Sequence, residues 1–272
     1  MFKVITLGDS NYFDSGQLFL KTRDVIKKHD IVLYGPDLTD KQIAKLNKNR
    51  IVYNKVDQRQ WDTQMQFLKL QFALNEINFD ISNQYEGFLS NDFDIFFVND
   101  WSHLYKHDFD LCITVRPSYI QKRIKRAYGC GGGFFFKHSA KELFEYAQNV
   151  ILNGGDKNIP EYDQIWKTLE IGRPPHKTHH RMTFRWWVDQ VFISSIVLRF
   201  LESKKYKQKF GLEPVFFNFN GFKIAFVSER YYNVINSNPV IRKEKNIYIR
   251  HLKESGRIKL VGKAKAKIKE KL

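Results

Sequence analysis

Residues 88–97 read Phe-Leu-Ser-Asn-Asp-Phe-Asp-Ile-Phe-Phe, an apolar run that is interrupted by two aspartates, Asp92 and Asp94. Two carboxylates this close together are unstable in the middle of a buried strand, because each would lose its hydration without gaining a partner. At the end of a strand or at a bulge they can instead converge on a hard divalent cation, Mg²⁺ or Mn²⁺. The stretch therefore predicts a strand end that carries either a metal site or a solvated turn between two strands.

The chain before this stretch alternates short apolar runs with helical patterns. We expect strands at residues 2–7, 31–34 and 50–53, which end in or are followed by turn-forming or helix-capping residues. The spacing of apolar residues predicts helices from Thr39 to about Leu46 and over residues 61–77. Strands that alternate with helices are typical of βαβ units, which build a parallel sheet with ligands at the carboxyl ends of its strands.

The same patterns continue to the C-terminal part of the chain. The further elements expected are strands at residues 84–89, 94–98, 110–115, 134–136, 214–219, 222–227 and 246–250, and helices at residues 139–152 and 187–203. The expected fold class is α/β, a single doubly wound domain with a mixed, mostly parallel sheet flanked by helices. We expect this domain to span residues 1–256 and a basic C-terminal tail to span residues 257–272.

The positive charge of the chain is concentrated in two segments. Lysine and arginine number 45 against 29 aspartates and glutamates, a formal net charge of +16. Residues 242–272 carry twelve basic and three acidic side chains. A second cluster in the segment 116–126 consists of Arg116, Lys122, Arg123, Lys125 and Arg126. The rest of the chain is close to neutral, so we expect a globular body with a basic loop and a basic tail that suit polyanionic partners.

Composition and the N-terminal residues indicate the class of protein and its location. Apolar residues make up 43% and aromatic residues 15% of the chain, which excludes a disordered protein. The chain has no run of 18 apolar residues, and its first residues are typical of a strand rather than a signal peptide. These observations predict a cytoplasmic protein. Cys112 lies in an apolar strand pattern and is expected to be a reduced core thiol.

Glycines or polar residues interrupt two other apolar runs. Residues 128–136 read Tyr-Gly-Cys-Gly-Gly-Gly-Phe-Phe-Phe, and such glycines allow either a tight bend or a close approach of the backbone to a ligand. Asp189 and Gln190 lie within an aromatic and aliphatic run at the expected start of a helix. There an acid is either favoured by the helix dipole or directed into a cleft.

Histidines that could bind a metal ion occur in two places. His251 follows the apolar run 247–249, and a single histidine at a strand end is usually structural unless it faces the Asp-x-Asp. His176, His179 and His180 form a second cluster. No cysteine or acid accompanies that cluster, so a solvated loop, which would line an acceptor site, is the favoured interpretation.

Taken in order, these motifs resemble the GT-A glycosyltransferases, in particular the nucleotide-diphospho-sugar transferases of the glycogenin and galactosyltransferase type. The resemblance covers about residues 2–259 and depends on the order of the motifs. It implies that Asp92 and Asp94 hold a divalent metal on the donor diphosphate and that His251 completes the metal site. It also implies an Asp189-Gln190 pair near the sugar and the reacting centre.

The resemblance assigns further residues to the donor. Thr6, Asp9 and Tyr12 would lie where the first strand meets the nucleoside. Gly132 and Gly133 would lie beside the donor sugar, and Lys259 would contact phosphate. The implied cofactor is Mn²⁺ or Mg²⁺, and the implied donor is a nucleotide-diphosphate sugar. A divalent metal stabilises a departing diphosphate by offsetting its charge. Whether the reaction inverts or retains stereochemistry stays open.

The two basic segments, 116–126 and 242–272, are expected to contact the acceptor. One candidate is a lipopolysaccharide or other membrane-associated glycan, with the tail held against anionic lipid at the inner face of the membrane. The other is nucleic acid, for instance a hydroxylated base in DNA.

Two alternatives to a glycosyltransferase remain at this point. A non-catalytic α/β protein that binds nucleic acid explains the charge but gives the two acidic motifs no role. A nucleotidyltransferase would need a glycine-rich basic signature after the first strand, which Gly8-Asp9-Ser10-Asn11 does not supply.

Overall fold

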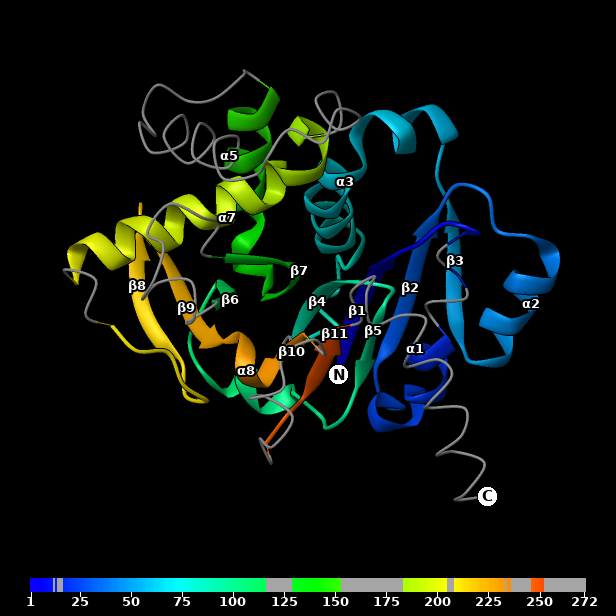
Figure 1. The fold of residues 1–272 in the computed structure, drawn as a ribbon, viewed down its shortest axis with the longest axis horizontal. Helices are drawn as coiled ribbons and strands as arrows, with labels where there is room; N and C mark the ends of the chain where they lie inside the picture. The colour runs from blue at the N-terminus through cyan, green and yellow to red at the C-terminus, as the bar shows by residue number, and fades with distance from the viewer. Residues whose placement is uncertain are drawn as a thin grey trace.

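A computed structural model describes residues 1–11, 13, 17–115, 129–152, 183–204, 208–232, 234–235 and 246–251 of the chain. Within these ranges the structure describes the backbone alone for residues 17–18, 62–67, 129–132, 150–152, 183–191, 234–235 and 251. The centre of the fold is a sheet of eight strands with helices on both of its faces (Figure 1).

The N-terminal half of the sheet is parallel, as the sequence predicts. It consists of β1 (Phe2–Leu7), β2 (Asp30–Gly35), β3 (Ile51–Lys55) and β4 (Gly87–Asp92), with β1 between β2 and β4. The helices that follow β1 to β3 return the chain to the start of the next strand, as in βαβ units. α2 (Asp40–Lys48) begins with a capping box, in which the Thr39 side chain accepts a hydrogen bond from the backbone of Gln42.

The C-terminal half of the sheet mixes both strand directions. β7 (Gly129–Phe136) runs antiparallel between β4 and β6 (Leu111–Val115), and β9 (Phe222–Ser228) and β8 (Val215–Phe219) complete the order β3-β2-β1-β4-β7-β6-β9-β8. Four of the seven neighbouring pairs are parallel, which confirms the expected mixed, mostly parallel sheet. A separate small sheet joins β10 (Val234–Ile235), β11 (Ile249–His251) and β5 (Ile95–Phe97).

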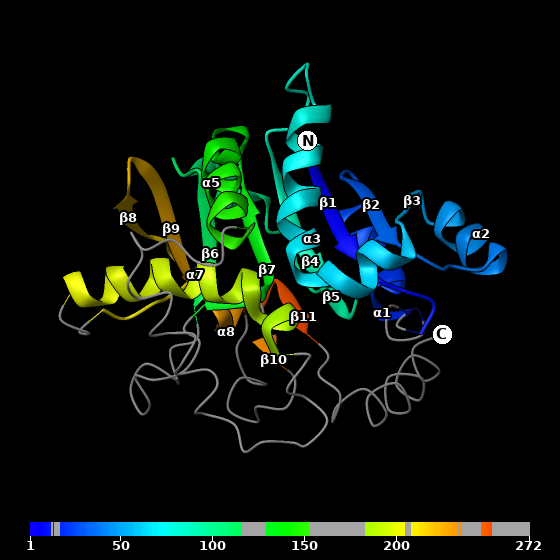
Figure 2. The same ribbon diagram turned by 90° about the horizontal axis from the view of Figure 1, so that it is seen from above.

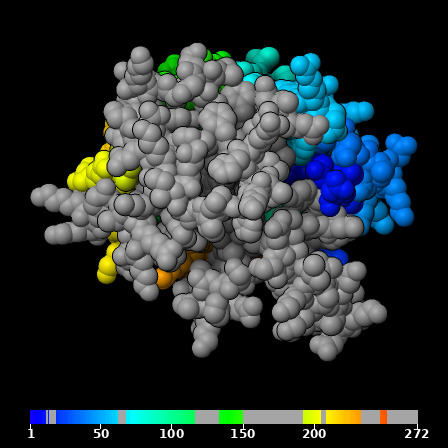
Figure 3. All heavy atoms as spheres, turned by 45° about the horizontal axis from the view of Figure 1, so that its top comes forward, coloured from blue at the N-terminus to red at the C-terminus, as the bar shows by residue number. Residues whose placement is uncertain are grey.

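The helices divide between the two faces of the large sheet (Figures 1 and 2). One face is covered by α3 (Gln58–Phe79), α5 (Lys141–Leu152) and α7 (Thr183–Ser203). The other face is covered by short elements and the small sheet, namely α1 (Gln17–Lys21), η1 (Arg23–Ile26), α2, η2 (Ser102–Lys106) and α8 (Glu229–Tyr232). One more short helix, η3 (His138–Ala140), leads into α5. In a space-filling view the early, blue elements and the yellow α7 lie on opposite sides of the molecule (Figure 3).

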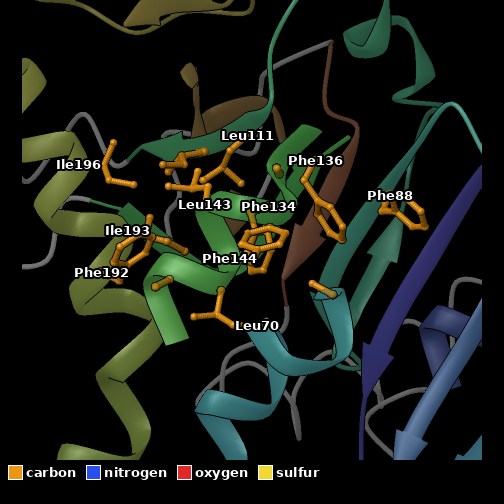
Figure 4. Packing of buried hydrophobic residues seen from close by; sticks show 14 of the residues in the cluster. Leu70, Phe88, Leu111, Phe134, Phe136, Leu143, Phe144, Phe192, Ile193 and Ile196 are labelled. Carbon is orange, nitrogen blue, oxygen red and sulfur yellow. The ribbon is translucent and has the colours of Figure 1, made fainter. Parts of the chain in front are cut away.

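Side chains of alternate strand residues build the two cores. On β7, Phe134 and Phe136 join the core under α3, α5 and α7, whereas Phe135 joins the core on the other face. The rings of Phe134, Phe136 and Phe144 lie together in the first core (Figure 4). Cys112 is fully buried, and burial raises the pKa of its thiol, so the expected core thiol is confirmed. In the part of the chain that the structure describes, no helix is both long and apolar enough to cross a membrane.

Several boundaries differ from the predictions; for example, the strand expected at residues 246–250 is β11, which begins only at Ile249. Residues 84 and 85 precede β4 because the Asp80 carboxylate accepts hydrogen bonds from the backbone N–H groups of Gln84 and Tyr85, which holds them in a turn. The glycines at 129–133 form no tight bend but are part of β7 itself. α7 begins at Thr183, so Asp189 and Gln190 lie in its second turn instead of at its start, and the helix-dipole explanation for the acid is wrong.

Candidate functional site

The carboxyl ends of β1, β2 and β4 form one edge of the large sheet, which we call the carboxyl edge. In the β1–β4 pair, Leu7 lies opposite Asp92 and Thr6 lies opposite Asn91. Thr6 and Asn91 are both buried, and the Asn91 amide nitrogen donates to the backbone carbonyl of Asp92 at 2.7 Å. Parallel pairing therefore brings the predicted nucleoside residue Thr6 next to the acidic motif.

The two aspartates lie at a strand end, as the sequence predicts. Asp92 is the last residue of β4, and Phe93 and Asp94 form the turn that leads into β5. Asp94 is only 6% exposed, so it does not belong to a solvated turn. The ring of Phe93 is buried against Phe13 and Phe19, which fixes the position of the turn between the two carboxylates.

A lysine that the sequence analysis did not select is placed at this motif. Lys69 on α3 is 4% exposed, and its Nζ lies 2.5 Å from Asp92 Oδ1. Burial of a lysine requires an anionic partner, which Asp92 supplies. A signal was present in the sequence, because Lys69 follows Met65 by four positions and precedes Phe72 by three, on the face expected to be apolar.

The loops after β1 and β2 are in close contact at the carboxyl edge. A Cβ atom at Gly35 would lie 2.1 Å from the carbonyl oxygen of Gly8, so only glycine fits there. The backbone N–H and hydroxyl of Ser10 donate to the two carboxylate oxygens of Asp37, at 2.8 and 2.6 Å. These contacts hold the loop that carries Asp9, a half-buried residue two positions beyond β1.

Tyr34, at the carboxyl end of β2, makes a structural contact and is not a candidate site residue. The Tyr34 hydroxyl donates to Glu76 Oε1 at 2.5 Å, and the Tyr34 ring stacks on Phe72. Burial and the neighbouring Glu76 carboxylate raise the pKa of Tyr34. Tyr34 therefore stays protonated and joins β2 to α3 as a structural contact.

The glycines of β7 lie against the acidic end of β4. Gly133 pairs with Asn91, and its carbonyl oxygen accepts a hydrogen bond from the Thr114 hydroxyl at 3.3 Å. A Cβ atom at residue 133 would meet nothing closer than the Ser90 carbonyl oxygen at 3.7 Å. Packing of the described residues therefore does not require glycine here. Gly132 is the next strand residue beyond Gly133, toward the end of β4.

Two other predicted site residues are described by their backbone. Asp189 and Gln190 lie on α7, which packs against α3 and β7.

His251 is the last residue of β11, which pairs antiparallel with β5, and His251 lies opposite Ile95. Because Ile95 directly follows Asp94, the backbone of the late histidine lies at the acidic motif.

A second Asp-Phe-Asp sequence occurs at residues 108–110 but lies at the opposite edge. It precedes β6, which has the same direction as β4, so it is at the amino end of its strand. Asp108 forms an ion pair with Lys223 at 2.5 Å, and Asp110 Oδ2 accepts a hydrogen bond from the backbone N–H of Lys223 at 2.7 Å. The two motifs are alike in sequence but have different surroundings.

The residues at the carboxyl edge fit a hard divalent cation by chemistry and by backbone placement. The two carboxylates suit Mn²⁺ or Mg²⁺, although the Lys69 ammonium at Asp92 would compete with a bound cation. Among the side chains that the structure describes, no three His, Cys, Asp or Glu residues form a metal-binding group. The side chain of His251 is not among them.

Several predicted residues lie outside the described residues. These are Tyr12, Lys259, the histidines at 176, 179 and 180, the basic segment 116–126 and the basic residues beyond 251. Of the basic segment 242–272, residues 246–251 belong to the fold, and Ile247 and Ile249 are buried in it.

Comparisons with known proteins agree with this architecture. No family model matches the sequence, and no curated protein matches it. A crystal structure of the galactosyltransferase LgtC in complex with donor and acceptor sugar analogs matches with a TM-score of 0.51 at 9% identity, covering 92% of this chain and 86% of that one. A second LgtC structure, an active-site mutant in which glutamate replaces glutamine, matches with a TM-score of 0.51 at 10% identity and the same coverage. The chain therefore has the GT-A fold of the LgtC structures.

Proposed function

We propose that this protein is a metal-dependent glycosyltransferase that takes its sugar from a nucleotide-diphosphate sugar. The observation that supports this best is the grouping of three residues at the end of β4. Asp92 is the last residue of this strand, the buried Asp94 follows in the turn, and β11 places the backbone of His251 opposite Ile95, directly after Asp94. The likeness in fold to a galactosyltransferase structure with donor and acceptor sugar analogs supports the same assignment.

In this proposal the carboxyl edge binds the donor. Asp92, Asp94 and His251 would hold Mn²⁺ or Mg²⁺, and the bound cation would offset the charge on the departing diphosphate. The Lys69 ammonium already lies at Asp92, so it would compete with the metal for this carboxylate. The remaining donor contacts would come from Thr6, Asp9 and Tyr12 toward the nucleoside, Gly132 and Gly133 beside the sugar, and Lys259 at phosphate.

Asp189 and Gln190 are the proposed groups at the reacting centre. They lie on α7, which packs against the glycine-containing strand β7. Asp189 would bind sugar hydroxyls or act as a base on the acceptor, and Gln190 would be a polar contact on the face of the sugar. The active-site mutant of LgtC, in which glutamate replaces glutamine, gives support for a role of a glutamine in this fold.

We propose a membrane-associated, anionic glycan as the acceptor. The basic tail, residues 257–272, begins six residues after His251, whose backbone lies at the candidate site. Lysine-rich segments bind anionic lipid surfaces. This arrangement would place the enzyme in the cytoplasm at the inner face of the membrane. The galactosyltransferase structure with an acceptor sugar analog supports a glycan more than a nucleic acid.

The metal role is tested by donor hydrolysis with Mn²⁺ in wild type and in the variant Asp92→Asn plus Asp94→Asn. Loss of the site removes several kcal/mol of charge stabilisation, so the rate should fall by about 100-fold or more. The matched control is Asp108→Asn plus Asp110→Asn, which changes the same motif at the opposite edge and should keep the rate. Equal rates in both double variants would contradict the proposal.

The acceptor is tested with the full chain over a salt series. We expect flotation with liposomes that contain anionic lipid, weakening as salt rises, and no shift of a DNA duplex in gels. DNA binding without liposome binding would contradict the membrane acceptor. If donor turnover were also absent, it would favour the non-catalytic nucleic-acid-binding alternative.

A further inference from the structure

The strand that carries His251 is held by an aromatic cluster that lies outside the candidate site. The ring of Tyr248 stacks on that of Tyr232, with centroids 5.0 Å apart and planes within 7°. The His103 ring contacts both tyrosines: its centroid lies 4.6 Å from that of Tyr248, and His103 Nε2 is 2.8 Å from the Tyr232 hydroxyl. Tyr232 is only 1% exposed, so the cluster packs against a ring that is buried in the core.

Backbone hydrogen bonds fix the same residue from both sides. The Tyr248 N–H donates to the Tyr231 carbonyl at 2.7 Å, and the Tyr248 carbonyl accepts from the N–H groups of Val98 at 2.8 Å and Asn99 at 3.3 Å. The Asn99 side-chain amide donates to the Ile247 carbonyl at 2.6 Å. Residues 247–249 therefore cannot slide along β5 without breaking these bonds.

This attachment determines where His251 lies. β11 lies in the small sheet with β5 (Figures 1 and 2). The two strands pair in the register Ile249–Phe97, Arg250–Phe96 and His251–Ile95. Residues paired in this way have Cα atoms about 5 Å apart, and Ile95 directly follows Asp94. A shift of one residue would turn the histidine to the opposite face of the small sheet. The position of the His251 backbone thus depends on contacts made three residues earlier.

We propose that Tyr248 is a positioning residue that fixes the register of β11 and so holds His251 at the Asp92–Asp94 motif. This inference rests on the proposed metal role of those three residues. Tyr248 acts through His251 and does not contact the metal. Residues that orient metal ligands typically change metal affinity by about 10–100-fold when they are removed.

The test measures binding of Mn²⁺ alone to the full chain, from the electron paramagnetic resonance signal of free Mn²⁺. Tyr248→Ala should weaken Mn²⁺ binding by about tenfold. Tyr248→Phe keeps the stacked ring and should restore wild-type affinity. The matched control is Phe217→Ala on β8, which removes a half-buried aromatic ring at the far edge of the large sheet and should leave Mn²⁺ affinity unchanged.

The decisive comparison uses His251→Ala as the background. If Tyr248 acts only through His251, adding Tyr248→Ala to His251→Ala should produce no further loss of Mn²⁺ affinity. An equal loss in both backgrounds, or no loss in Tyr248→Ala alone, would overturn the proposal. If Tyr248→Ala does not fold, Asn99→Ala, which removes the bond to the Ile247 carbonyl, takes its place under the same criteria.

The same series separates this inference from the proposed function. No loss of Mn²⁺ binding in either Asp92→Asn plus Asp94→Asn or His251→Ala would overturn the metal site itself. Loss in both, together with unchanged binding in Tyr248→Ala, would overturn the positioning role alone.

Discussion

The two ends of the β4–β7 pair differ in chemistry although they belong to the same two strands. At one end Phe88 lies opposite Phe136, and the rings stack with centroids 5.1 Å apart. At the other end Asn91 lies opposite Gly133, and Asp92 follows. One end is filled with aromatic rings, whereas the other has polar groups beside residues that have no side chain.

The difference indicates a division of roles along one ladder. The aromatic end is packed under α5 and supplies apolar burial, which stabilises the fold. At the glycine end, a Cβ atom at residue 133 would meet no atom of the described residues closer than 3.7 Å, so these residues leave space beside Asn91. A polar site at the end of a strand reduces stability, and the dense core at the other end of the same strands offsets that loss.

The largest expected effect on stability comes from the aromatic end. Phe136→Ala removes a fully buried ring that contacts Phe88 and Phe144, and should lower the free energy of unfolding by about 3–5 kcal/mol. Urea unfolding measures the loss. The Mn²⁺ affinity of the folded fraction should stay at the wild-type value, and a strong reduction would show that the two ends are not separable.

The next largest expected effect on stability concerns the turn before the aromatic end. Asp80 is buried; burial acts to raise its pKa, but hydrogen bonds from the Tyr85 and Gln84 backbone and from His138 outweigh this and lower the pKa below its ordinary value. A carboxyl with a depressed native pKa stabilises the fold above its unfolded pKa, about 3.9, and the stabilisation is lost as pH falls through the native pKa.

Asp80→Asn should therefore cost about 1–3 kcal/mol of unfolding free energy at pH 7. The gap to wild type should narrow as pH falls below about 4, since the Asp80 carboxyl of the unfolded chain becomes protonated there, and it should be smallest below the native pKa. Urea unfolding at a series of pH values measures the gap. A gap that stays constant over this range would show that ionisation of Asp80 does not contribute.

A smaller effect, on Mn²⁺ affinity, is expected at the acidic end. Lys69→Met removes the ammonium that lies 2.5 Å from Asp92 Oδ1 and so removes a cation that competes with metal. An ion pair with a partly exposed partner is worth about 1 kcal/mol or less, so Mn²⁺ alone should bind up to about fivefold more tightly. Lys45→Met, on the exposed face of α2, is the control. Weaker Mn²⁺ binding in Lys69→Met alone would contradict this prediction.

The smallest effect on stability is expected for Gly133→Ala. Among the described residues the added Cβ finds no contact closer than 3.7 Å, so the free energy of unfolding should change by less than about 1 kcal/mol. The KM for the donor should nevertheless rise, because the methyl group takes space beside the proposed sugar position. Donor hydrolysis and urea unfolding of the same preparation test both statements. A large loss of stability would contradict the proposed division between the two ends.

Much of the fold could be predicted from local patterns. β1 has the predicted bounds, Thr39 caps α2, and the apolar spacing gives α3 and α7 to within a few residues at most ends. The strand boundary at Gly87 was missed because it depends on Asp80, whose carboxylate binds the backbone four and five residues later. Lys69 was missed because a charged residue on an apolar helix face shows its partner only in the folded chain.

By itself the sequence determined the α/β class, the strand-end position of Asp92 and Asp94, and the concentration of charge in two segments. It contains two Asp-Phe-Asp stretches, 92–94 and 108–110, and local pattern does not distinguish their edges. Only the tertiary structure decided this, because strand direction sets which edge of the sheet each stretch occupies. The pairing of β5 with β11, which places His251 opposite Ile95, was likewise decided by the tertiary structure. Such pairing depends on backbone hydrogen bonds between residues far apart in the sequence, which no local pattern encodes.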